Sequence, residues 1–298
     1  HAYLAAGVLS VVPFVLLRED AASAGAWSLA VAAAATAAVL VGLHLNRPPE
    51  RLAWHLIAAS GVLVAAGAAA TVFTSELPQQ AGFPSVAGVL PLGGSVAVAA
   101  ALAVFVRRST VARDWATIAD AGIVALGAFS VAWMLLVRPA LHDPSLGPAA
   151  RIGLLAGVTA GTAVLGIATR LLLTAVRGAE RWIVGGAAVT QALAACAVPL
   201  AVVYDRPWAA ALSFPLAVAA LVLWGAAALH PDMWWLTQPG DAAEPWPTRR
   251  RLALLAPAAL AVLVLVGYET LVAENRVRGV PLLASALLAG LLAARLVG

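Results

Sequence analysis

Apolar segments of membrane-spanning length recur along almost the whole chain, separated by short polar loops. An α-helix needs roughly 20 apolar residues to cross the hydrocarbon core of a bilayer, with a range of about 17–25. We predict ten such segments: 2–17, 25–45, 52–74, 84–106, 116–137, 152–176, 182–203, 208–229, 252–272 and 280–296. The expected fold is all-α, a polytopic integral membrane helix bundle of about ten transmembrane helices with no β-sheet.

The composition excludes an ordinary soluble domain. Hydrophobic residues make up 63% of the 298 residues and charged residues 11%, whereas soluble domains have about 45–50% apolar and about 25% charged residues. The net charge of +4 does not indicate a nucleic-acid partner, because the arginines stand in short loops between apolar segments. We therefore expect the lipid bilayer of the inner (plasma) membrane as partner, and a single transmembrane domain over residues 1–298.

The longest polar interruption lies within Leu221–Arg251 and indicates an orientation. The apolar segment stops at His230-Pro231, where proline removes a backbone donor and disfavours helix in the residue before it. Trp234, Trp235 and Trp246 follow, and Arg249–Arg251 close the stretch. Tryptophan prefers the headgroup level and clustered arginine marks the cytoplasmic side, so we expect this loop to be cytoplasmic.

Loop arginines extend this orientation to the whole chain. With both ends cytoplasmic, ten loop arginines lie inside and six outside, a bias of the expected sign. The inner ones are Arg47, Arg51, Arg107, Arg108, Arg113, Arg177, Arg181 and Arg249–Arg251, and the outer ones are Arg18, Arg138, Arg151, Arg206, Arg276 and Arg278. We predict a multi-pass protein with both ends cytoplasmic.

A weak parallel repeat relates residues 51–106 to residues 180–229. RLAWHLIAASGVLVAAGAAATVF, followed by FPSVAGVL, parallels ERWIVGGAAVTQALAACAVPLAVV, followed by FPLAVAALVL. The copies are an even number of helices apart, so the repeat is parallel, unlike the inverted repeats of many transporters. The chain begins at His1 without a charged leader and ends at Gly298 without a hydrophilic tail, which we interpret as an excised N-terminal region.

Polar groups inside the hydrocarbon are costly, about 2.5–3.5 kcal/mol for Asp or Arg at a helix centre, and therefore mark candidate sites. Asp120 and Arg170 lie within two turns of a segment end, as does Glu269. Each would either anchor the interface or face a ligand or a partner helix. Gln191 is the strongest polar group at the midplane, either as an interhelical hydrogen-bond donor or as a ligand contact. Weaker polar groups at similar depth are Thr36, Ser60, Ser95, Thr159, Thr162 and Ser213. The candidate ligand-binding residues are Asp120, Gln191 and Arg170.

Small residues and proline mark two packing features. Gly153, Gly157 and Gly161 form a GxxxGxxxG stripe that should bury against another helix, because small residues let backbones approach closely. Pro91, followed by Gly93-Gly94, should loosen the fourth segment. The result would be a kink, or a broken helix that lines a pocket.

The sequence indicates neither a catalytic site nor a metal site. The histidines fall at segment ends or in loops without an i, i+4 repeat, and Cys196 is the only cysteine. A Ser-His-Asp arrangement, a P-loop and a glycine-rich nucleotide fingerprint are all missing from the sequence. We expect no enzyme activity and no cofactor in this segment.

Several stretches resemble a known family. WGAAALHPDM (Trp224–Met233) resembles the GAAALHPSM segment in the membrane-embedded N-terminal regions of actinobacterial GGDEF/EAL (cyclic-di-GMP) signalling proteins. FPSVAGVLPLGG, RDWATIADAGIVALGAFSVAWMLLVRPALHDPS and TRRRLALLAPAALAVLVLV are similar to the same family, so the resemblance covers roughly residues 50–298. It implies a sensory, input or anchoring region that precedes a diguanylate cyclase or phosphodiesterase domain and binds an unknown small ligand, with a homodimer formed through that cytoplasmic domain.

The chain departs from this family at several polar positions. The family often has an acid after the glycine of its third helix, where Gly67-Ala68 stand here, and another near Gly88. Its tyrosine-proline and aspartate in the sixth helix are replaced by Val158–Thr162, and of these acids Asp120 is retained. Two alternatives stay open. A ten-helix small-molecule transporter usually has carboxylates at the midplane, and a membrane enzyme acting on lipids would need acids or histidines clustered at one face. The sequence has neither.

Overall fold

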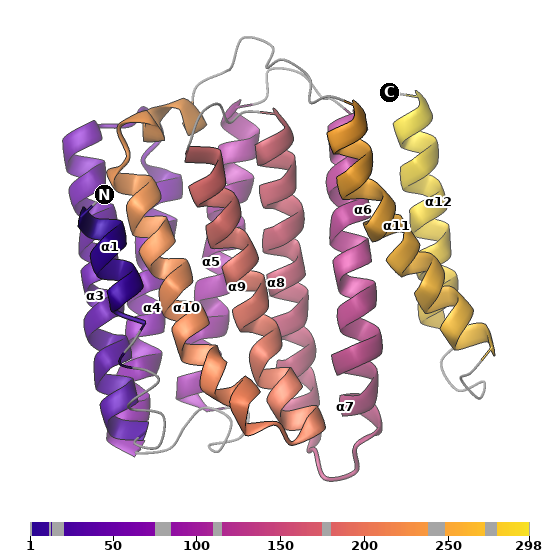
Figure 1. The fold of residues 1–298 in the computed structure, drawn as a ribbon, viewed down its shortest axis with the longest axis horizontal. Helices are drawn as coiled ribbons and strands as arrows, with labels where there is room; N and C mark the ends of the chain where they lie inside the picture. Colours follow the sequence, from indigo (N-terminus) through magenta and orange to yellow (C-terminus); the bar gives the residue numbers. More distant parts are fainter. Residues whose placement is uncertain are drawn as a thin grey trace.

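The computed structural model describes residues 2–11, 13, 21–74, 85–109, 115–174, 180–237, 248–271 and 279–297, and over these residues it is helical without a strand. In Figure 1 the first helices of the chain lie at the left and the last two lie at the right. The α-helices are α1 (Ala2–Leu9), α3 (Ala21–Asn46), α4 (Leu52–Thr74), α5 (Val86–Ser109), α6 (Trp115–Ala132), α7 (Arg138–His142), α8 (Pro148–Thr174), α9 (Glu180–Tyr204), α10 (Pro207–Leu229), α11 (Thr248–Leu271) and α12 (Gly279–Val297). A π-helical turn, Trp133–Val137, joins α6 to α7, and a 3-10 helix, η2 (Pro231–Thr237), follows α10.

The all-α membrane architecture is confirmed for the described residues, but the count of ten spans is not supported. Six helices are long and apolar enough to cross a bilayer, namely residues 22–46, 52–74, 86–108, 115–142, 148–173 and 182–204. The described apolar stretches of α10, α11 and α12 are shorter, at 10–17 residues. Of the first predicted segment, 2–17, the structure describes residues 2–11 and 13, and α1 accounts for 8 of them.

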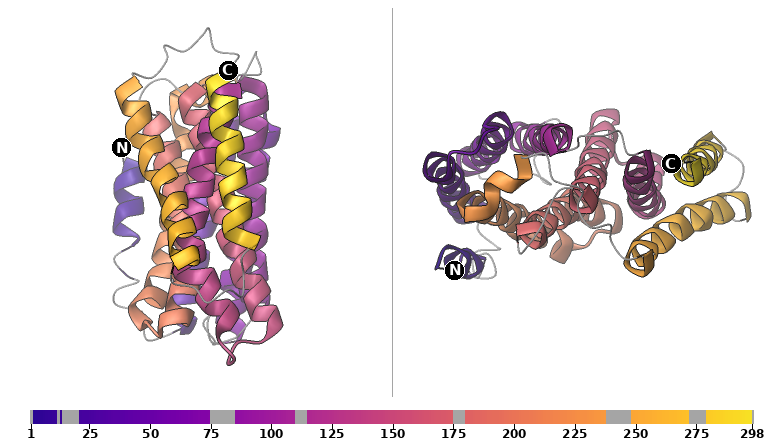
Figure 2. Two further views of the ribbon diagram at one scale, coloured as in Figure 1. Left: turned by 90° about the vertical axis from the view of Figure 1, so that its right-hand side faces the viewer. Right: turned by 90° about the horizontal axis from the view of Figure 1, so that it is seen from above.

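Six helices form a closed ring. Each packs against the next in the order α3, α4, α5, α8, α9 and α10, and α10 packs back against α3. The end-on view in Figure 2 shows this ring with η2 lying across one end. The two copies of the weak sequence repeat are hairpins of this ring, α4–α5 and α9–α10, each made of antiparallel neighbours. Ring closure between α10 and α3 encloses the interior in which the candidate site lies.

Three further helices, α6, α11 and α12, pack beside the ring. α6 contacts α8 on one side and α11 and α12 on the other. Glycines make these contacts close: a Cβ at Gly166 of α8 would lie 2.6 Å from the Cβ of Ala125, and one at Gly127 would meet the backbone of Ala258. Small residues therefore hold α6 between the ring and the two last helices.

The end of the ring at which α3 ends and α4 begins carries Arg47, Arg51, Arg107 and Arg108, and we call it the arginine-rich end. Its interior is filled by large side chains with no exposure, among them Trp54, Phe105 and Trp224. The rings of Trp54 and Phe105 meet edge to face with centroids 5.2 Å apart.

The turn at His230-Pro231 seals this end. η2 crosses it and inserts Met233 and Leu236, both fully buried, into the same core. The side-chain amide of Asn46, the last residue of α3, donates to the carbonyl oxygens of Ala228 and His230 at 3.1 and 3.3 Å. The predicted helix stop is thus present, and the chain that follows it closes the ring. The side chains of Trp234 and Trp235, expected at the headgroup level, lie outside the described residues.

A proline accounts for the π-helical turn. Pro139 has no N–H, so the carbonyl of Leu135 loses its usual partner four residues on, and the ladder shifts locally to the wider π pattern over Trp133–Val137. The hydroxyl of Tyr204, at the end of α9, donates to that carbonyl at 2.8 Å. This bond connects the continuous helix formed by α6, the π-helical turn and α7 to the ring, at the end opposite the arginine-rich end.

Candidate functional site

The ring encloses a cavity of about 280 Å³, near the lower limit for small-molecule sites. All six ring helices contribute to its wall, and none of the described residues that line it is charged. Polar lining is limited to a few side chains. The polar lining residues are Ser28, Thr71, Ser95, Gln191 and Ser213.

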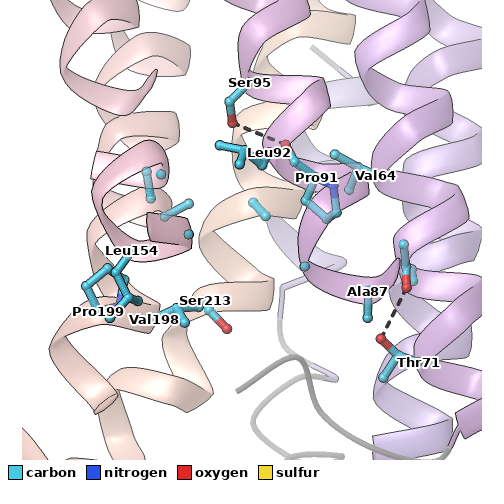
Figure 3. Close-up of a pocket in the computed structure, with 18 of the residues that line it drawn as sticks. Val64, Thr71, Ala87, Pro91, Leu92, Ser95, Leu154, Val198, Pro199 and Ser213 are labelled. Carbon is cyan, nitrogen blue, oxygen red and sulfur yellow. Dashed lines mark hydrogen bonds between the residues drawn. The ribbon is translucent and has the colours of Figure 1, made fainter. Parts of the chain in front are cut away.

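The cavity lies in the half of the ring that η2 does not cover. It reaches from Ser95 and Gln191, near the middle of α5 and α9, to Leu146 in the loop before α8 and Val202 near the end of α9. Figure 3 shows its two walls, with Pro91, Ala87 and other residues of α4 and α5 facing residues of α8, α9 and α10. We call the ring end at which α4 ends and α5 begins the cavity end.

Gln191 and Ser95 form the deepest polar pair. Both are nine-tenths buried or more, and Gln191 Nε2 donates to Ser95 Oγ at 2.9 Å. Ser95 Oγ in turn donates to the carbonyl of Pro91 at 3.3 Å. Because the single hydroxyl proton is used there, the amide must present its N–H to Ser95, which leaves its carbonyl oxygen for the cavity. Gln191 Oε1 has no hydrogen-bond partner among the described residues.

Two prolines add backbone acceptors, one on each of the two cavity walls. Pro91 and Pro199 stand inside α5 and α9 and cannot donate to the carbonyls four residues before them, those of Ala87 and Ala195. Both alanines line the cavity. The helix break considered for Pro91 is not present, since α5 is continuous, yet this helix does line a pocket. No pocket-lining role was predicted for Pro199, although a proline inside an apolar segment was the available signal.

Ser28 adds a hydroxyl without a partner. It is 1% exposed, lines the cavity from α3, and its Oγ has no hydrogen-bond partner in the part of the chain that the structure describes. A buried polar group left unpaired costs about 1–3 kcal/mol, so a ligand that bonds to it would recover this energy. The sequence did not distinguish Ser28 from the other serines of its apolar segments.

The glycine stripe of α8 divides between packing and lining. A Cβ at Gly161 would lie 2.8 Å from the Cβ of Ala195, so α8 and α9 approach closely there, as predicted. At Gly157 the nearest atom to such a Cβ is the carbonyl oxygen of Ala195 at 4.0 Å, and Gly153 and Gly157 both line the cavity. At Gly157 the stripe thus leaves the close α8–α9 interface and becomes part of the cavity wall.

Asp120 lies outside the cavity and pairs with a partner helix. Its carboxylate is fully buried in α6, and Arg295 Nε of α12 approaches Oδ1 at 2.9 Å. The end-on view in Figure 2 shows α12 beside α6, outside the ring. A partner helix was one of the two expectations for Asp120, but Arg295 was not predicted as its partner, although its position at the end of the last apolar segment was the available signal.

The remaining candidates do not join the cavity. Arg170 lies in the last two turns of α8, near the arginine-rich end, while the cavity is lined by the first half of that helix. The side chain of Glu269 lies outside the described residues. Within the described ranges no group of three metal-ligating side chains comes together.

The loop before α8, at the cavity end, has a fixed conformation. The backbone N–H and the hydroxyl of Ser145 donate to Asp143 Oδ1 at 2.8 and 2.6 Å, and Arg151 donates to the backbone carbonyl of Asp143 at 2.6 Å. The hydrogen bonds from Ser145 lower the pKa of Asp143 below its usual value, because they favour the charged form. This loop carries Leu146, one of the lining residues at that end.

No family model, curated protein or solved structure was found to match the chain.

Proposed function

We propose that this chain is the membrane-embedded input region of a signalling protein and that its stimulus is an uncharged small molecule bound in the ring cavity. One observation carries the ligand part of this proposal: the cavity is closed at one end by a packed core and lined along its depth by unpaired hydrogen-bonding groups. The resemblance of Trp224–Met233 and other stretches to the membrane regions of GGDEF/EAL proteins supports the signalling part.

The lining specifies a largely apolar ligand with a hydrogen-bond donor. Gln191 Oε1 and the carbonyls of Ala87 and Ala195 are acceptors, which a hydroxyl or N–H of the ligand would satisfy. An ionised ligand is disfavoured because the lining holds no opposite charge, and burying an unpaired charge is costly. Ala68 and Gly88, at positions where the resembled family often has acids, line this cavity. The ligand of this chain should therefore be less polar than one that pairs with acids.

A packed route leads from the cavity to the last helix. α8 lines the cavity with its first half and holds Ala125 of α6 through Gly166 in its second half. α6 holds α12 through Gly122, whose added Cβ would lie 2.8 Å from Leu291, and through the Asp120–Arg295 pair. A ligand that shifts α8 would therefore shift α12, provided that it binds the two arrangements of α8 with different affinity.

The proposal includes the full topology of ten spans in the plasma membrane with both ends cytoplasmic. The arginine-rich end is then cytoplasmic and the cavity end external, so the ligand enters from outside or from the outer leaflet. A cysteine introduced at Ala242 should resist a membrane-impermeant thiol reagent in intact cells, and one at Gln79 should react. The reverse labelling pattern would contradict this orientation.

A transporter is the competing function, and the closed end of the ring favours an input region. Trp54, Phe105, Met233 and Leu236 fill the path from the cavity to the arginine-rich end, and coupling carboxylates are missing from the described cavity lining. The reading frame beyond Gly298 distinguishes the two functions. A GGDEF or EAL domain there would support signalling, whereas a stop codon would favour transport.

Photolabelling of the full chain tests the cavity as a ligand site. The probe is an aliphatic alcohol of about eight carbons that carries a diazirine, offered to the protein in phosphatidylcholine nanodiscs beside the matching alkane and carboxylic acid. We expect insertion into the cavity walls of α8 and α9, with the alcohol about fivefold ahead of the alkane, since one hydrogen bond contributes about 1 kcal/mol. The acid should label least.

Two leucine substitutions provide the test variant and its control. Gly157→Leu fills the cavity and should abolish this labelling, while Gly290→Leu should leave it unchanged because nothing lies within 4 Å of a Cβ placed there. Gln191→Leu should remove the preference for alcohol over alkane. Labelling that spreads over the lipid-facing surface and survives Gly157→Leu would refute the cavity as a binding site.

A further inference from the structure

A second depression, of about 410 Å³, lies at the arginine-rich end between the end of α3 and the start of α4. Four of its six lining residues are basic. The lining residues are Leu40, Leu43, His44, Arg47, Arg51 and His55. It is separate from the ring cavity, because the two share no residue and lie toward opposite ends of the helices.

The basic side chains of this depression are not neutralised by the protein. Glu50 is the acid closest to Arg47 and Arg51 in the sequence, and it is already engaged: its Oε2 lies 2.9 Å from Arg108 Nε and its Oε1 accepts from the backbone N–H of Leu52. Within the described residues Arg47 and Arg51 have no acidic partner. The site therefore keeps an excess of positive charge and free guanidinium donors, which suit a planar, bidentate contact with phosphate oxygens.

The backbone holds Arg47 in an unfavourable conformation. Its φ is 44°, one of two positive values among the described non-glycine residues, and Pro48-Pro49 follow directly. This is the position after a helix end where glycine or asparagine is usual, since a larger side chain is strained there. Asn46 fixes the preceding turn by its bonds to α10 and η2. An arginine at such a position points to a role for its side chain.

The depression lies on the side of the bundle that faces lipid. α3 and α4 form the edge of the molecule farthest from α12 (Figure 1, Figure 2). Leu40, Leu45 and Leu52 beside the site are 47%, 68% and 56% exposed, which for a membrane helix means contact with acyl chains. A ligand here has its charged group among the basic side chains and its apolar part along leucines.

We propose that this depression binds the phosphate of an anionic membrane lipid, with Arg47 and Arg51 on the phosphate oxygens, His44 and His55 at its rim, and an acyl chain along Leu40. The positive-inside rule accounts for arginines at this end of the helices. It does not account for four basic side chains around one depression or for the strained backbone of Arg47. Basic pockets between helices at this level suit lipid phosphates.

Native mass spectrometry of the full chain released from detergent tests the proposal. The probes are dioleoylphosphatidic acid and, as the neutral comparison, dioleoylphosphatidylcholine. We expect retention of about one phosphatidic acid per chain in the wild type and at least tenfold less in the Arg47→Gln/Arg51→Gln variant. The Arg107→Gln/Arg206→Gln variant removes the same charge elsewhere and should retain the lipid as the wild type does. Equal retention in both variants would overturn the site.

Inorganic phosphate distinguishes a lipid from a free anion. The melting temperature of the detergent-solubilised chain should rise with phosphatidic acid and stay unchanged with inorganic phosphate at the same ionic strength. A rise with inorganic phosphate and no lipid retention would overturn the lipid assignment. The Arg47→Gly variant is the control for loss of binding through misfolding, since glycine relieves the strained backbone at this position. It should melt no lower than the wild type and still lose lipid, and retention in this variant would contradict the role of Arg47.

Discussion

Alanine at two glycines of one stripe should have opposite effects on stability. A Cβ at Gly161 would lie 2.8 Å from the Cβ of Ala195, whereas carbon atoms rest about 3.5–4.0 Å apart. α8 and α9 must therefore separate locally by several tenths of an ångström or more, and overpacking of this kind costs about 1–3 kcal/mol. A Cβ at Gly157 would meet its nearest neighbour at 4.0 Å, so Gly157→Ala is free of this cost.

The helical backbone adds a second term to this comparison. Alanine is favoured over glycine within a helix by about 0.5–1 kcal/mol on scales measured in water. Gly157→Ala should therefore be neutral or stabilising, and Gly161→Ala should be less stable than Gly157→Ala by about 1–3 kcal/mol. Unfolding of the purified variants in mixed micelles with increasing dodecyl sulfate measures the difference. Equal stabilities, or Gly157→Ala as the weaker variant, would refute the assignment of these glycines to cavity and interface.

Three further outcomes follow from the polar contacts. Asp120→Leu should destabilise the bundle by about 2–3 kcal/mol, at or below the range for fully buried ion pairs, because Arg295 is 36% exposed. Adding Arg295→Leu should restore part of this loss, and additive losses in mixed-micelle unfolding would contradict the pairing. Arg47→Gly should raise unfolding free energy by about 1 kcal/mol, since it removes a left-handed strain, and a lower melting temperature would count against that strain. Because the pKa of Asp143 is lowered in the folded state, its carboxylate contributes stability at pH values above its unfolded-state pKa, and this stability is lost as the pH falls through its folded-state pKa. The melting temperature of the wild type should therefore drop more on acidification than that of Asp143→Asn. Parallel curves of melting temperature against pH would argue against the Ser145 bonds.

Local features of the fold could be predicted from the sequence because they depend on a few neighbouring residues. The predicted segment 52–74 has the same bounds as α4, and the stop at His230-Pro231 ends α10 as expected. In both cases hydrophobic length and proline chemistry determine the result, and these act within one or two helical turns. The identity of Gln191 as a buried polar group at mid-depth followed in the same way.

The arrangement of the helices could not be predicted, because it depends on which faces meet. Helices such as α3 and α4 are apolar on every side, so periodicity does not indicate their buried face. Closure of the ring between α10 and α3, and the pairing of Asp120 with Arg295, join residues far apart in the sequence. Gly157 illustrates the same limit, since one stripe of small residues serves an interface at one end and a cavity at the other.

The most direct test of the input-region account is whether breaking the contact between α6 and α12 changes ligand affinity in the ring cavity. Coupling between two sites is reciprocal, so a ligand that shifts α12 must bind differently when α12 is released. The measurement is the concentration of the diazirine alcohol at half-maximal labelling of the cavity walls, in the wild type and in Gly122→Leu, whose side chain would displace Leu291 of α12. We predict a shift of about fivefold or more, the usual lower bound for coupling energies of about 1–3 kcal/mol. Equal half-maximal concentrations would contradict the claim that the cavity communicates with the last helix.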